Sequence, residues 1–282
     1  MTYDYHEPRS MSGALDLLAR YGEDAHLLAG GTATVILMRQ GLLRPAHVIA
    51  LRRISELGGV SRAPDGGLRI GAMATHRVVE RSPEARAYSH ALTAAFASVA
   101  TVRIRNQATV GGNLAHADPA QDPPPMLAAF GATVTVVSPR GTRSVPALDL
   151  AVDHFTTSLA HDEIISEVLL PPLAPGTRAT YLKFLPKTAD DYATVSVAAT
   201  MRLSPDGTIA ETRIVLGAVG PKPMRLRRTE DAIRGRPPSD LGAALAFVPD
   251  EVDPTDDARG SAAYKRAMAK VWTARALTQL AR

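Results

Sequence analysis

The residues from Thr109 to Pro125, TVGGNLAHADPAQDPPP, bring several chemically capable groups into one short segment. The segment contains a double glycine, an Asn, a His, two Asp and four Pro. Gly and Pro both interrupt regular structure, so this composition predicts a bent chain that is neither one strand nor one helix throughout. The question is which chemistry requires such a bend.

Metal binding and acid/base catalysis are the first chemistries that His116, Asp118 and Asp122 suggest. Their spacing fits no standard metal signature, and His and Asp residues of loops more often form turns or cap helices. The chain has no Cys and no GxSxG motif, which argues against a nucleophilic triad. We therefore assign no catalytic residue and no metal ligand. Other histidines, such as His76 and His154, are expected on the surface or as hydrogen-bonded core residues.

Phosphate binding is the second chemistry, and the double glycines suggest it. Without Cβ atoms, Gly30-Gly31 and Gly111-Gly112 can present backbone N–H groups closely to an anion such as a pyrophosphate. Small hydroxyl residues that could add hydrogen bonds flank both pairs: Thr32, Thr34 and Thr109. The alternative is that these pairs only permit tight turns, as the two glycine pairs within residues 58–67 are expected to do. Neither a GxGxxG nor a GxxxxGK[ST] motif occurs.

The elements that position these groups can be inferred from hydrophobic periodicity. Residues 11–21 predict an amphipathic helix that Gly22 stops. Residues 25–50 predict a strand, a glycine turn, a short helix from Thr34 to Gln40 and a second strand. The segment LRIGAMATHRVVERSP predicts a strand, a turn and a helix whose N-cap is Thr75.

A helix from Ala91 to Ala100 is expected before the bent segment, and strands at ATVTVVS and EIISEVLL after it. The segment PPLAPGTRA has the character of an inter-domain linker. Beyond it, antiparallel strands with a turn at residues 205–207 and a final amphipathic helix are expected. The whole pattern is α+β with mixed sheets and no repeat of fixed period.

Composition limits the classes of function. At 282 residues and 45% apolar, the chain can bury a sizeable core. Its 32 basic and 28 acidic residues are interleaved, so we expect no nucleic-acid partner. Without Cys it cannot hold an iron-sulfur cluster or a thiolate zinc site by itself. No secretory signal and no transmembrane segment is recognisable, so a cytoplasmic protein is expected.

Four ordered segments, taken together, resemble a known family. They are AGGTATVILMRQGLLRPAHVIAL, IGAMATH, RNQATVGGNLAHADPAQDPPP and YLKFLPKTADDYATVSVAA. The chain resembles, over nearly its whole length, the FAD-binding medium subunit of the xanthine dehydrogenase and aerobic carbon monoxide dehydrogenase family of molybdenum hydroxylases.

The resemblance implies a fold of three parts. Two N-terminal subdomains, residues 1–56 and 57–172, would form the FAD-binding fold of the vanillyl-alcohol oxidase type. Residues 177–282 would form the smaller C-terminal α/β domain found in carbon monoxide dehydrogenase flavoproteins. The bent segment would then be one of two clamps on the FAD diphosphate, which answers the opening question.

The resemblance also implies the residues that contact FAD. The first clamp corresponds to Ala29, Gly30, Gly31, Thr32, Ala33 and Thr34. The second corresponds to Thr109, Gly111, Gly112 and Asn113, on the phosphates and ribityl chain. Further FAD-lining positions are Thr75, Val99, Ala100 and Ile165, with Asp122 on a polar edge of the cofactor, Lys183 beside the flavin and Tyr192 against the isoalloxazine. Relatives commonly carry HS or TD after the first glycine pair, so a polar side-chain contact from position 33 is missing here.

The function implied is electron transfer. FAD would be bound noncovalently, and the molybdenum cofactor and iron-sulfur clusters would lie only on partner chains. Those partners would be a molybdenum-binding large subunit and an iron-sulfur small subunit, in a dimer of heterotrimers, with NAD or a quinone as the electron acceptor. Two alternatives remain open, namely a self-contained FAD-dependent oxidase or reductase of the same fold and an assembly module that has lost its flavin.

Overall fold

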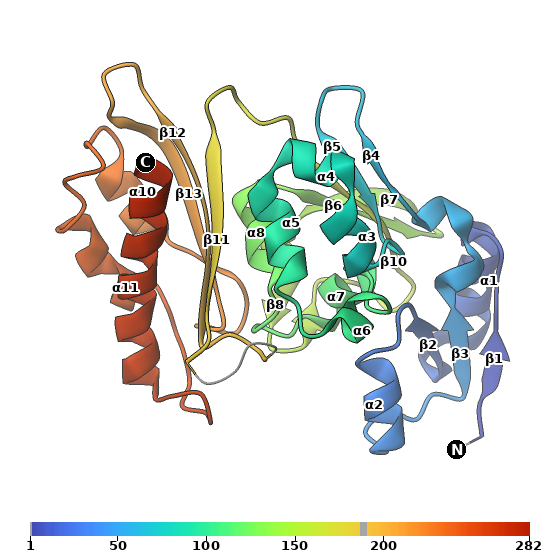
Figure 1. Cartoon of the computed structure of the whole chain (residues 1–282). Coiled ribbons are helices and arrows are strands. Elements are labelled where there is room, and N and C mark those ends of the chain that lie inside the picture. Colours follow the sequence, from blue (N-terminus) through green and yellow to red (C-terminus); the bar gives the residue numbers. More distant parts are fainter. Residues whose placement is uncertain (1, 187–190) are drawn as a thin grey trace.

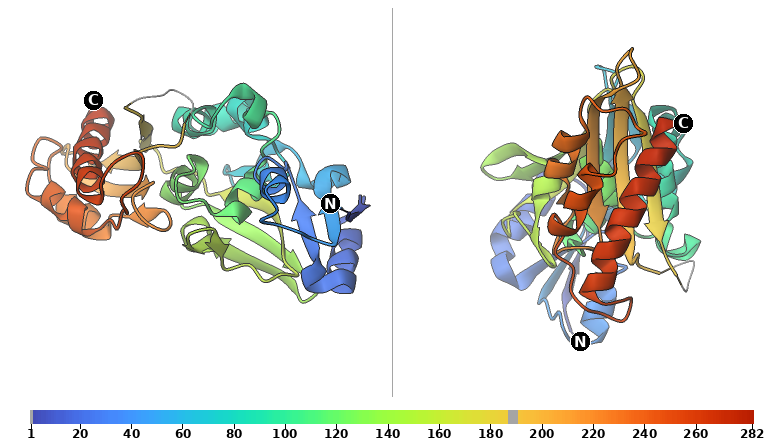
Figure 2. Two further views of the ribbon diagram at one scale, coloured as in Figure 1. Left: turned by 90° about the horizontal axis from the view of Figure 1, so that it is seen from below. Right: turned by 90° about the vertical axis from the view of Figure 1, so that its left-hand side faces the viewer.

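The computed structural model describes residues 2–186 and 191–282. The chain forms three units in a row, with the two termini at opposite ends (Figures 1 and 2). Each unit is built on its own main sheet. Among the described residues, no helix combines the length and apolar character needed to cross a bilayer.

The first unit is a small parallel sheet with strand order β1-β3-β2. Its elements are β1 (Asp4–His6), α1 (Met11–Tyr21), β2 (Ala25–Leu28), α2 (Thr34–Arg39) and β3 (His47–Ala50). The predicted strand, turn, helix and strand are confirmed here, since α2 connects two parallel strands. Short 3-10 turns at residues 22–24, 51–53 and 55–57 complete the unit.

The second unit is an antiparallel sheet with order β4-β5-β10-β6-β7. Its strands are β4 (Val60–Arg62), β5 (Leu68–Gly71), β6 (Thr133–Ser138), β7 (Gly141–Pro146) and β10 (Ile164–Leu170). Its helices are α3 (His76–Arg81), α4 (Pro83–Tyr88), α5 (His90–Ala97), α6 (Val102–Arg105), α7 (Val110–His116), α8 (Pro123–Ala129) and α9 (Ala147–Leu150). A two-stranded hairpin, β8 (Ala151–Asp153) and β9 (Thr156–Thr157), projects from it.

Two expectations from the sequence can be compared with the structure of this unit. The bent segment consists of α7 and α8 joined by a loop, because Ala117 turns left-handed (φ 50°) after α7 and prolines begin α8. The helix expected from Ala91 to Ala100 ends earlier, at Ala97. Residues 98–101 turn away instead, and Ala100 has a positive φ that helical backbone cannot continue.

The third unit is an antiparallel sheet with order β11-β12-β13-β14. Its elements are β11 (Arg178–Phe184), β12 (Val195–Leu203), β13 (Ile209–Gly217), β14 (Met224–Arg225), α10 (Arg227–Ile233), a 3-10 segment (Ala244–Asp250) and α11 (Ala262–Ala281). Both faces of this sheet are covered, by α11 on one side and by α5 and α8 on the other (Figure 1). For that reason β12 is buried nearly throughout instead of alternating.

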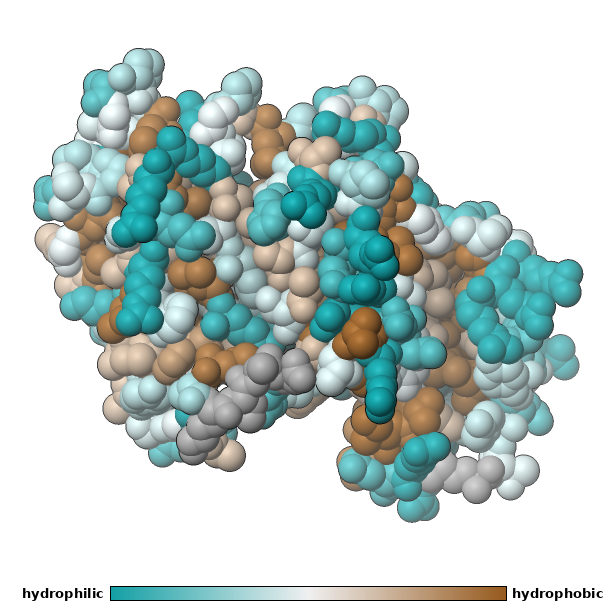
Figure 3. Space-filling view, in the orientation of Figure 1, coloured by the Kyte–Doolittle hydropathy of each residue, from teal (hydrophilic) through white to brown (hydrophobic). Residues whose placement is uncertain are grey.

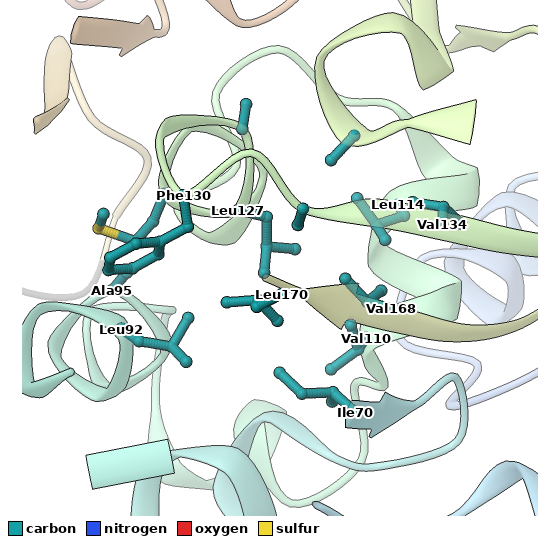
Figure 4. Close-up of a cluster of buried hydrophobic side chains, with 14 of the residues drawn as sticks. Ile70, Leu92, Ala95, Val110, Leu114, Leu127, Phe130, Val134, Val168 and Leu170 are labelled. Carbon is teal, nitrogen blue, oxygen red and sulfur yellow. The ribbon is translucent and has the colours of Figure 1, made fainter. Parts of the chain in front are cut away.

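The largest core lies in the second unit and continues into the third. Ile70, Leu92, Leu127, Phe130 and Val168 point toward one another there (Figure 4). Buried residues of β11, β12 and β13 belong to the same cluster. This shared core fixes the third unit against the second, so side chains from β11 have a defined place beside α5 and α8.

Candidate functional site

The first glycine loop, residues 29–34, joins β2 to α2. Gly31 has a φ of +75°, a conformation that glycine adopts without strain. Among the described residues, the backbone N–H groups of Gly30, Gly31, Thr32, Ala33 and Thr34 donate to no protein acceptor. A run of successive free N–H groups is a concave anion site, with partial positive charge on every donor.

The second glycine loop, residues 109–113, begins α7 and uses its N–H groups differently. The N–H groups of Val110 and Gly111 donate to the carbonyls of Ala74 (3.0 Å) and Ala72 (2.8 Å). The N–H of Gly112 donates to Thr109 Oγ1 at 3.2 Å. The Thr109 hydroxyl keeps its own proton for another acceptor.

The structure brings the two loops together. A Cβ on Gly30 would lie 2.0 Å from the carbonyl oxygen of Gln107. A Cβ on Gly112 would lie 3.2 Å from Ala29 Cβ and 4.0 Å from the backbone nitrogen of Gly30. The distance at Gly30 excludes a side chain, and that at Gly112 leaves little room for one, so glycine at these positions allows the loops to touch. A β-bridge between Thr75 and Thr109 adds the predicted N-cap of α3 to the same place.

An orphaned side-chain atom lies at this junction. Oδ1 of Asn113 is buried and has no hydrogen-bond partner among the described residues. Buried polar atoms are normally satisfied, so an unpaired one on the residue that follows Gly112, which lies against the first loop, suggests a ligand. A diphosphate can accept from the loop N–H groups, and a neighbouring hydroxyl can donate to Asn113. The residues therefore fit a dinucleotide cofactor.

His76, which follows Thr75, differs from its expected role as a surface or hydrogen-bonded core residue. Its side chain is fully buried, and neither ring nitrogen has a partner among the described residues. The ring packs against Phe96 with centroids 5.3 Å apart. Burial, helped by the Arg105 cation, lowers the pKa of His76 to about 4, so the imidazole is neutral at physiological pH. The expectation was wrong because the packing of α3 on α5 excludes water from this ring.

A second cluster of predicted residues lies where β11 meets α5 and α8. Lys183 Nζ donates to Asp122 Oδ2 and to the carbonyl of Ser98, both at 2.8 Å. The Tyr181 hydroxyl donates to Asp122 Oδ1 at 2.5 Å. Burial raises the pKa of Asp122, whereas Lys183 and Tyr181 act in the opposite direction. Sequence reasoning missed Tyr181, although its spacing of two from Lys183 puts both on one face of a strand.

Val99 and Ala100 border this second cluster. Arg105 donates from Nη1 to both of their carbonyl oxygens at 2.8 Å, and its Nε donates to Glu80 at 2.9 Å. The left-handed turn at Ala100 is thus held by a guanidinium that is itself anchored. No sequence motif indicated Arg105, because the contact depends on how the chain turns between α5 and α6.

The remaining two predicted residues are a core residue and a partly exposed tyrosine. Ile165 is 6% exposed and belongs to the core around β10. Tyr192 is 42% exposed and carries the guanidinium of Arg259 over its ring, 5.4 Å from the centroid. Burial of the hydroxyl, with the charge of Asp118 as the next cause, raises the pKa of Tyr192 to about 12.

No group of His, Cys, Asp and Glu among the described residues is arranged to hold a metal ion. His116 packs against Phe155 with ring centroids 5.3 Å apart, and Asp118 accepts from the N–H of Ala120. The chemistry of the site therefore lies in anion-binding amides and in a buried ion pair. This arrangement defines a cofactor-binding protein in which the chain supplies binding groups.

Comparison with known proteins identifies the class of cofactor. Residues 1–173 match the FAD binding domain in molybdopterin dehydrogenase, and residues 180–280 match the CO dehydrogenase flavoprotein C-terminal domain. The carbon monoxide dehydrogenase medium chain of Hydrogenophaga pseudoflava is 34% identical, covering 98% of this chain and 96% of the relative. The xanthine dehydrogenase FAD-binding subunit of Escherichia coli O157:H7 is 30% identical, covering 98% and 94%.

Solved structures agree with the sequence matches. Carbon monoxide dehydrogenase from Hydrogenophaga pseudoflava superimposes with a TM-score of 0.94 at 35% identity, covering 99% of this chain and 96% of the other. Quinoline 2-oxidoreductase from Pseudomonas putida 86 gives a TM-score of 0.92 at 30% identity, covering 100% and 97%. The chain belongs to the FAD-binding medium subunits of the xanthine dehydrogenase and carbon monoxide dehydrogenase family. It is thus an oxidoreductase subunit with the two-domain FAD-binding fold and the C-terminal flavoprotein domain, as the sequence predicted.

Proposed function

We propose that this chain is the electron-transfer subunit of a molybdenum hydroxylase complex. It takes electrons from iron-sulfur clusters on a partner chain and passes them to NAD or another acceptor such as a quinone. Bound FAD supplies the required chemistry, since a flavin accepts single electrons and can give up a pair. The single observation that carries the proposal is the run of free N–H groups from Gly30 to Thr34, in a loop that the second glycine loop contacts.

In this proposal, the protein binds and orients FAD. The loop N–H groups hold the diphosphate, and charge-assisted hydrogen bonds of this kind contribute roughly 1.5–3 kcal/mol each. Thr75, Thr109 and Asn113 add polar contacts along the same line. Lys183 presents a buried cation beside the flavin, and Asp122 positions it while neutralising its charge. Val99, Ala100, Ile165 and Tyr192 complete the lining.

The absence of Cys supports placing the iron-sulfur clusters elsewhere, because thiolates are their usual ligands. The proposed partners are an iron-sulfur small subunit and a molybdenum-binding large subunit, in a dimer of heterotrimers. A related structure is described as lacking the Mo-pyranopterin moiety of its molybdenum cofactor. Relatives of this chain are named for substrates as different as carbon monoxide, xanthine and nicotine. This variety supports the proposal that another subunit selects the substrate.

An exposed apolar surface supports a partner near the first glycine loop. Val35 and Ile36 of α2 are 39% and 53% exposed, and Leu42 just beyond is 73% exposed. Hydrophobic residues gather over α2 at the lower edge of the molecule (Figure 3). Apolar groups clustered in this way commonly mark an interface between proteins.

The test begins with the purified full-length chain. We expect a flavin absorption spectrum, and acid precipitation should release all of the FAD into the supernatant because binding is noncovalent. Yellow colour left in the pellet would show a covalent bond. A colourless chain whose spectrum stays blank after incubation with FAD would favour the flavin-less assembly module.

Co-expression with the neighbouring subunits tests the complex. Co-purification with a cysteine-rich chain and a molybdenum-binding chain is the expected result. The isolated chain should not hydroxylate a purine, an aldehyde or carbon monoxide. Turnover by the pure, metal-free chain would favour the self-contained flavin enzyme and overturn the assignment as an electron-transfer subunit.

A further inference from the structure

A pocket lies where the segment between β10 and β11 crosses from the second unit to the third (Figure 1). The second unit contributes the end of α8 and the crossing segment, and the third unit contributes β12 and β13. The pocket has a volume of about 190 Å³. Of the described residues, those assigned to FAD contact all lie outside its lining. A ligand in this pocket would therefore be a molecule other than the flavin.

The register of β12 and β13 places charged side chains on the wall of the pocket. Arg202 pairs with Glu211 across the two strands, and Arg213 lies two residues further along β13. Side chains two apart along a strand share a face, so Glu211 and Arg213 lie on the same face as Val215. Val215 belongs to the core that the third unit shares with the second. The two guanidinium groups therefore lie on the side of the sheet that faces the second unit.

Arg213 is a half-buried cation with no carboxylate partner among the described residues. Its guanidinium makes one long hydrogen bond, from Nη1 to the carbonyl of Ala128 at 3.5 Å. It lies against the backbone of Gly131, where its Nη1 leaves no room for a side chain. Burial, with the Arg225 cation as the next cause, lowers the pKa of Arg213. A cation in this position is stabilised when an anion accepts its hydrogen bonds.

Arg202 supplies a second guanidinium with an unused donor. Its Nη2 lies 3.4 Å from Glu211 Oε2. Its Nε is buried and has no partner among the described residues. Buried polar atoms are normally hydrogen-bonded, so this N–H lacks an acceptor that a ligand in the pocket would provide.

The charges at the pocket favour an anion. Among the described residues, its charged lining consists of Arg202, Arg213 and Glu211, and the Glu211 side chain is 64% exposed. Arg225 and Glu230, the next charged pair, neutralise each other across 2.8 Å. An excess of cations in a partly enclosed site attracts anions.

The apolar walls and the volume define which anion fits. Phe130, Pro171, Pro172, Leu173 and Met201 line the remainder of the pocket. Sites for drug-sized ligands span roughly 300–1,000 Å³, so this pocket accommodates a smaller molecule. A carboxylate accepts two parallel hydrogen bonds from one guanidinium. A small carboxylate with an apolar body therefore uses both halves of the lining, whereas a bare phosphate ion would leave the apolar half in contact with water.

We propose that this pocket binds a small organic carboxylate. Arg213 donates to the carboxylate oxygens, and the Arg202 Nε–H is a further donor. The apolar body of the ligand packs on Phe130 and on the crossing segment. The ligand thus bridges the second and third units, so its binding also stabilises their packing. This inference is independent of the flavin chemistry.

The experiment measures binding to the purified full-length chain by isothermal titration calorimetry, at constant ionic strength and without carboxylate or phosphate in the buffer. The probe is cyclohexanecarboxylate, a saturated ring that offers no aromatic face to the flavin. Cyclohexanemethanol has the same apolar body without the charge, and inorganic phosphate has charge without an apolar body.

Variants assign the binding to the pocket. Arg213→Met removes the guanidinium and keeps an apolar stem, and Arg213→Lys keeps the charge without the forked geometry. Arg227→Met is the matched control, because Arg227 is an exposed arginine near Arg213 that does not line the pocket. It changes the net charge by the same amount as Arg213→Met.

We expect cyclohexanecarboxylate to bind the wild-type and Arg227→Met chains with the same dissociation constant. Binding to Arg213→Met should be weaker by about tenfold or more, the scale of one lost charge-assisted hydrogen bond, with Arg213→Lys in between. The alcohol and phosphate should bind more weakly than the carboxylate. Saturating carboxylate should raise the melting temperature of the wild type but not of Arg213→Met.

Two results would overturn the proposal of a carboxylate site. One is the absence of cyclohexanecarboxylate binding to the wild type, and the other is equal binding to the wild type and Arg213→Met. Phosphate binding as tight as that of the carboxylate would refute the class of ligand. Should circular dichroism show that Arg213→Met does not fold, Arg202→Met takes its place, and undiminished binding to that variant would equally contradict the site.

Discussion

The two glycine loops offer a comparison of neighbouring regions with the same dipeptide. In the loop of residues 29–34, five consecutive N–H groups from Gly30 onward have no acceptor among the described residues. In the loop of residues 109–113, the N–H groups of Val110, Gly111, Gly112 and Asn113 all donate within the protein. Yet each pair contains a glycine wedged against backbone or Cβ atoms.

The comparison teaches that a double glycine can be required for two reasons. In both loops a side chain is excluded by close packing, at Gly30 against Gln107 and at Gly111 against Ala72. Only the first loop also leaves its N–H groups free for an anion. We infer that the first loop binds the diphosphate through the backbone, whereas the second contributes side chains and holds the first in place.

Substitution at Gly30 should have the largest effect. In Gly30→Val, the new Cβ would lie 2.0 Å from the Gln107 oxygen, and one backbone segment must move. We expect the free energy of unfolding of the flavin-free chain to fall by about 3 kcal/mol or more, beyond ordinary overpacking. Thermal and urea unfolding measure this change. Gly242→Val is the control, since Gly242 has open space and no positive φ. Equal stability of both variants would contradict the close packing of Gly30 against Gln107.

The pH dependence of stability tests the burial of His76, whose backbone N–H donates to Ala108 just before the second loop. His76 has a folded pKa of about 4 and an ordinary value near 6.5 when unfolded. As the pH falls, the unfolded chain therefore binds the proton before the folded chain does. The stability that the neutral His76 contributes is fully present above pH 6.5 and is lost as the pH falls toward 4. The loss should be on the order of 3 kcal/mol. Urea unfolding across this range would show the slope, and His76→Leu should flatten it.

Gly112→Val compares the contribution of the second loop to FAD binding with its contribution to folding. Gly112 lies within α7 and has no positive φ, so the cost is steric: a Cβ meets Thr109 Oγ1 at 2.9 Å and Ala29 at 3.2 Å. Pushing Ala29 away should misplace the first loop and weaken FAD binding by about a hundredfold, the scale of two lost phosphate bonds.

The measurement is FAD per chain beside a circular dichroism melt, again with Gly242→Val as control. Gly59, in one of the turn-forming glycine pairs, is not a suitable control, because its φ of +82° makes any side chain strained. Full flavin occupancy in Gly112→Val would contradict the prediction that the contact between the loops supports FAD binding. Global unfolding would show that folding, and not binding, requires this glycine.

A variant at Asn113 tests how much a side chain of the second loop contributes to FAD affinity. Asn113→Leu removes the orphaned Oδ1 without adding a buried donor, so stability should be unchanged or slightly higher. FAD affinity should fall by about tenfold if a cofactor group satisfies that oxygen. Isothermal titration with FAD gives the affinity. An unchanged dissociation constant would assign FAD binding to the first loop alone.

Tyr192 should produce the smallest effect on binding. We expect Tyr192→Ala to alter the flavin spectrum or its reoxidation rate while FAD content stays near normal, because this ring lies apart from both loops. An unchanged spectrum and rate would indicate that the ring serves packing against Arg259 only.

The sequence determined the fold class, the family and most helices and strands of this protein. Local patterns suffice there: α1 follows its apolar spacing, and Thr75 caps α3 as its residue type predicts. The sequence also singled out the two glycine loops, where close packing leaves no room for a side chain at Gly30 and Gly111. The precise domain limits and the FAD contacts themselves stay predictions.

Tertiary structure alone decided how those positions are used. Whether a glycine N–H is free depends on carbonyls distant in sequence, such as that of Ala72 for Gly111. The pairing of Asp122 with Lys183, the burial of His76 and the positive φ of Phe155 likewise arise from segments that meet only in the folded chain. Hydrogen bonding and desolvation act over a few ångströms in space, so a one-dimensional pattern does not contain them.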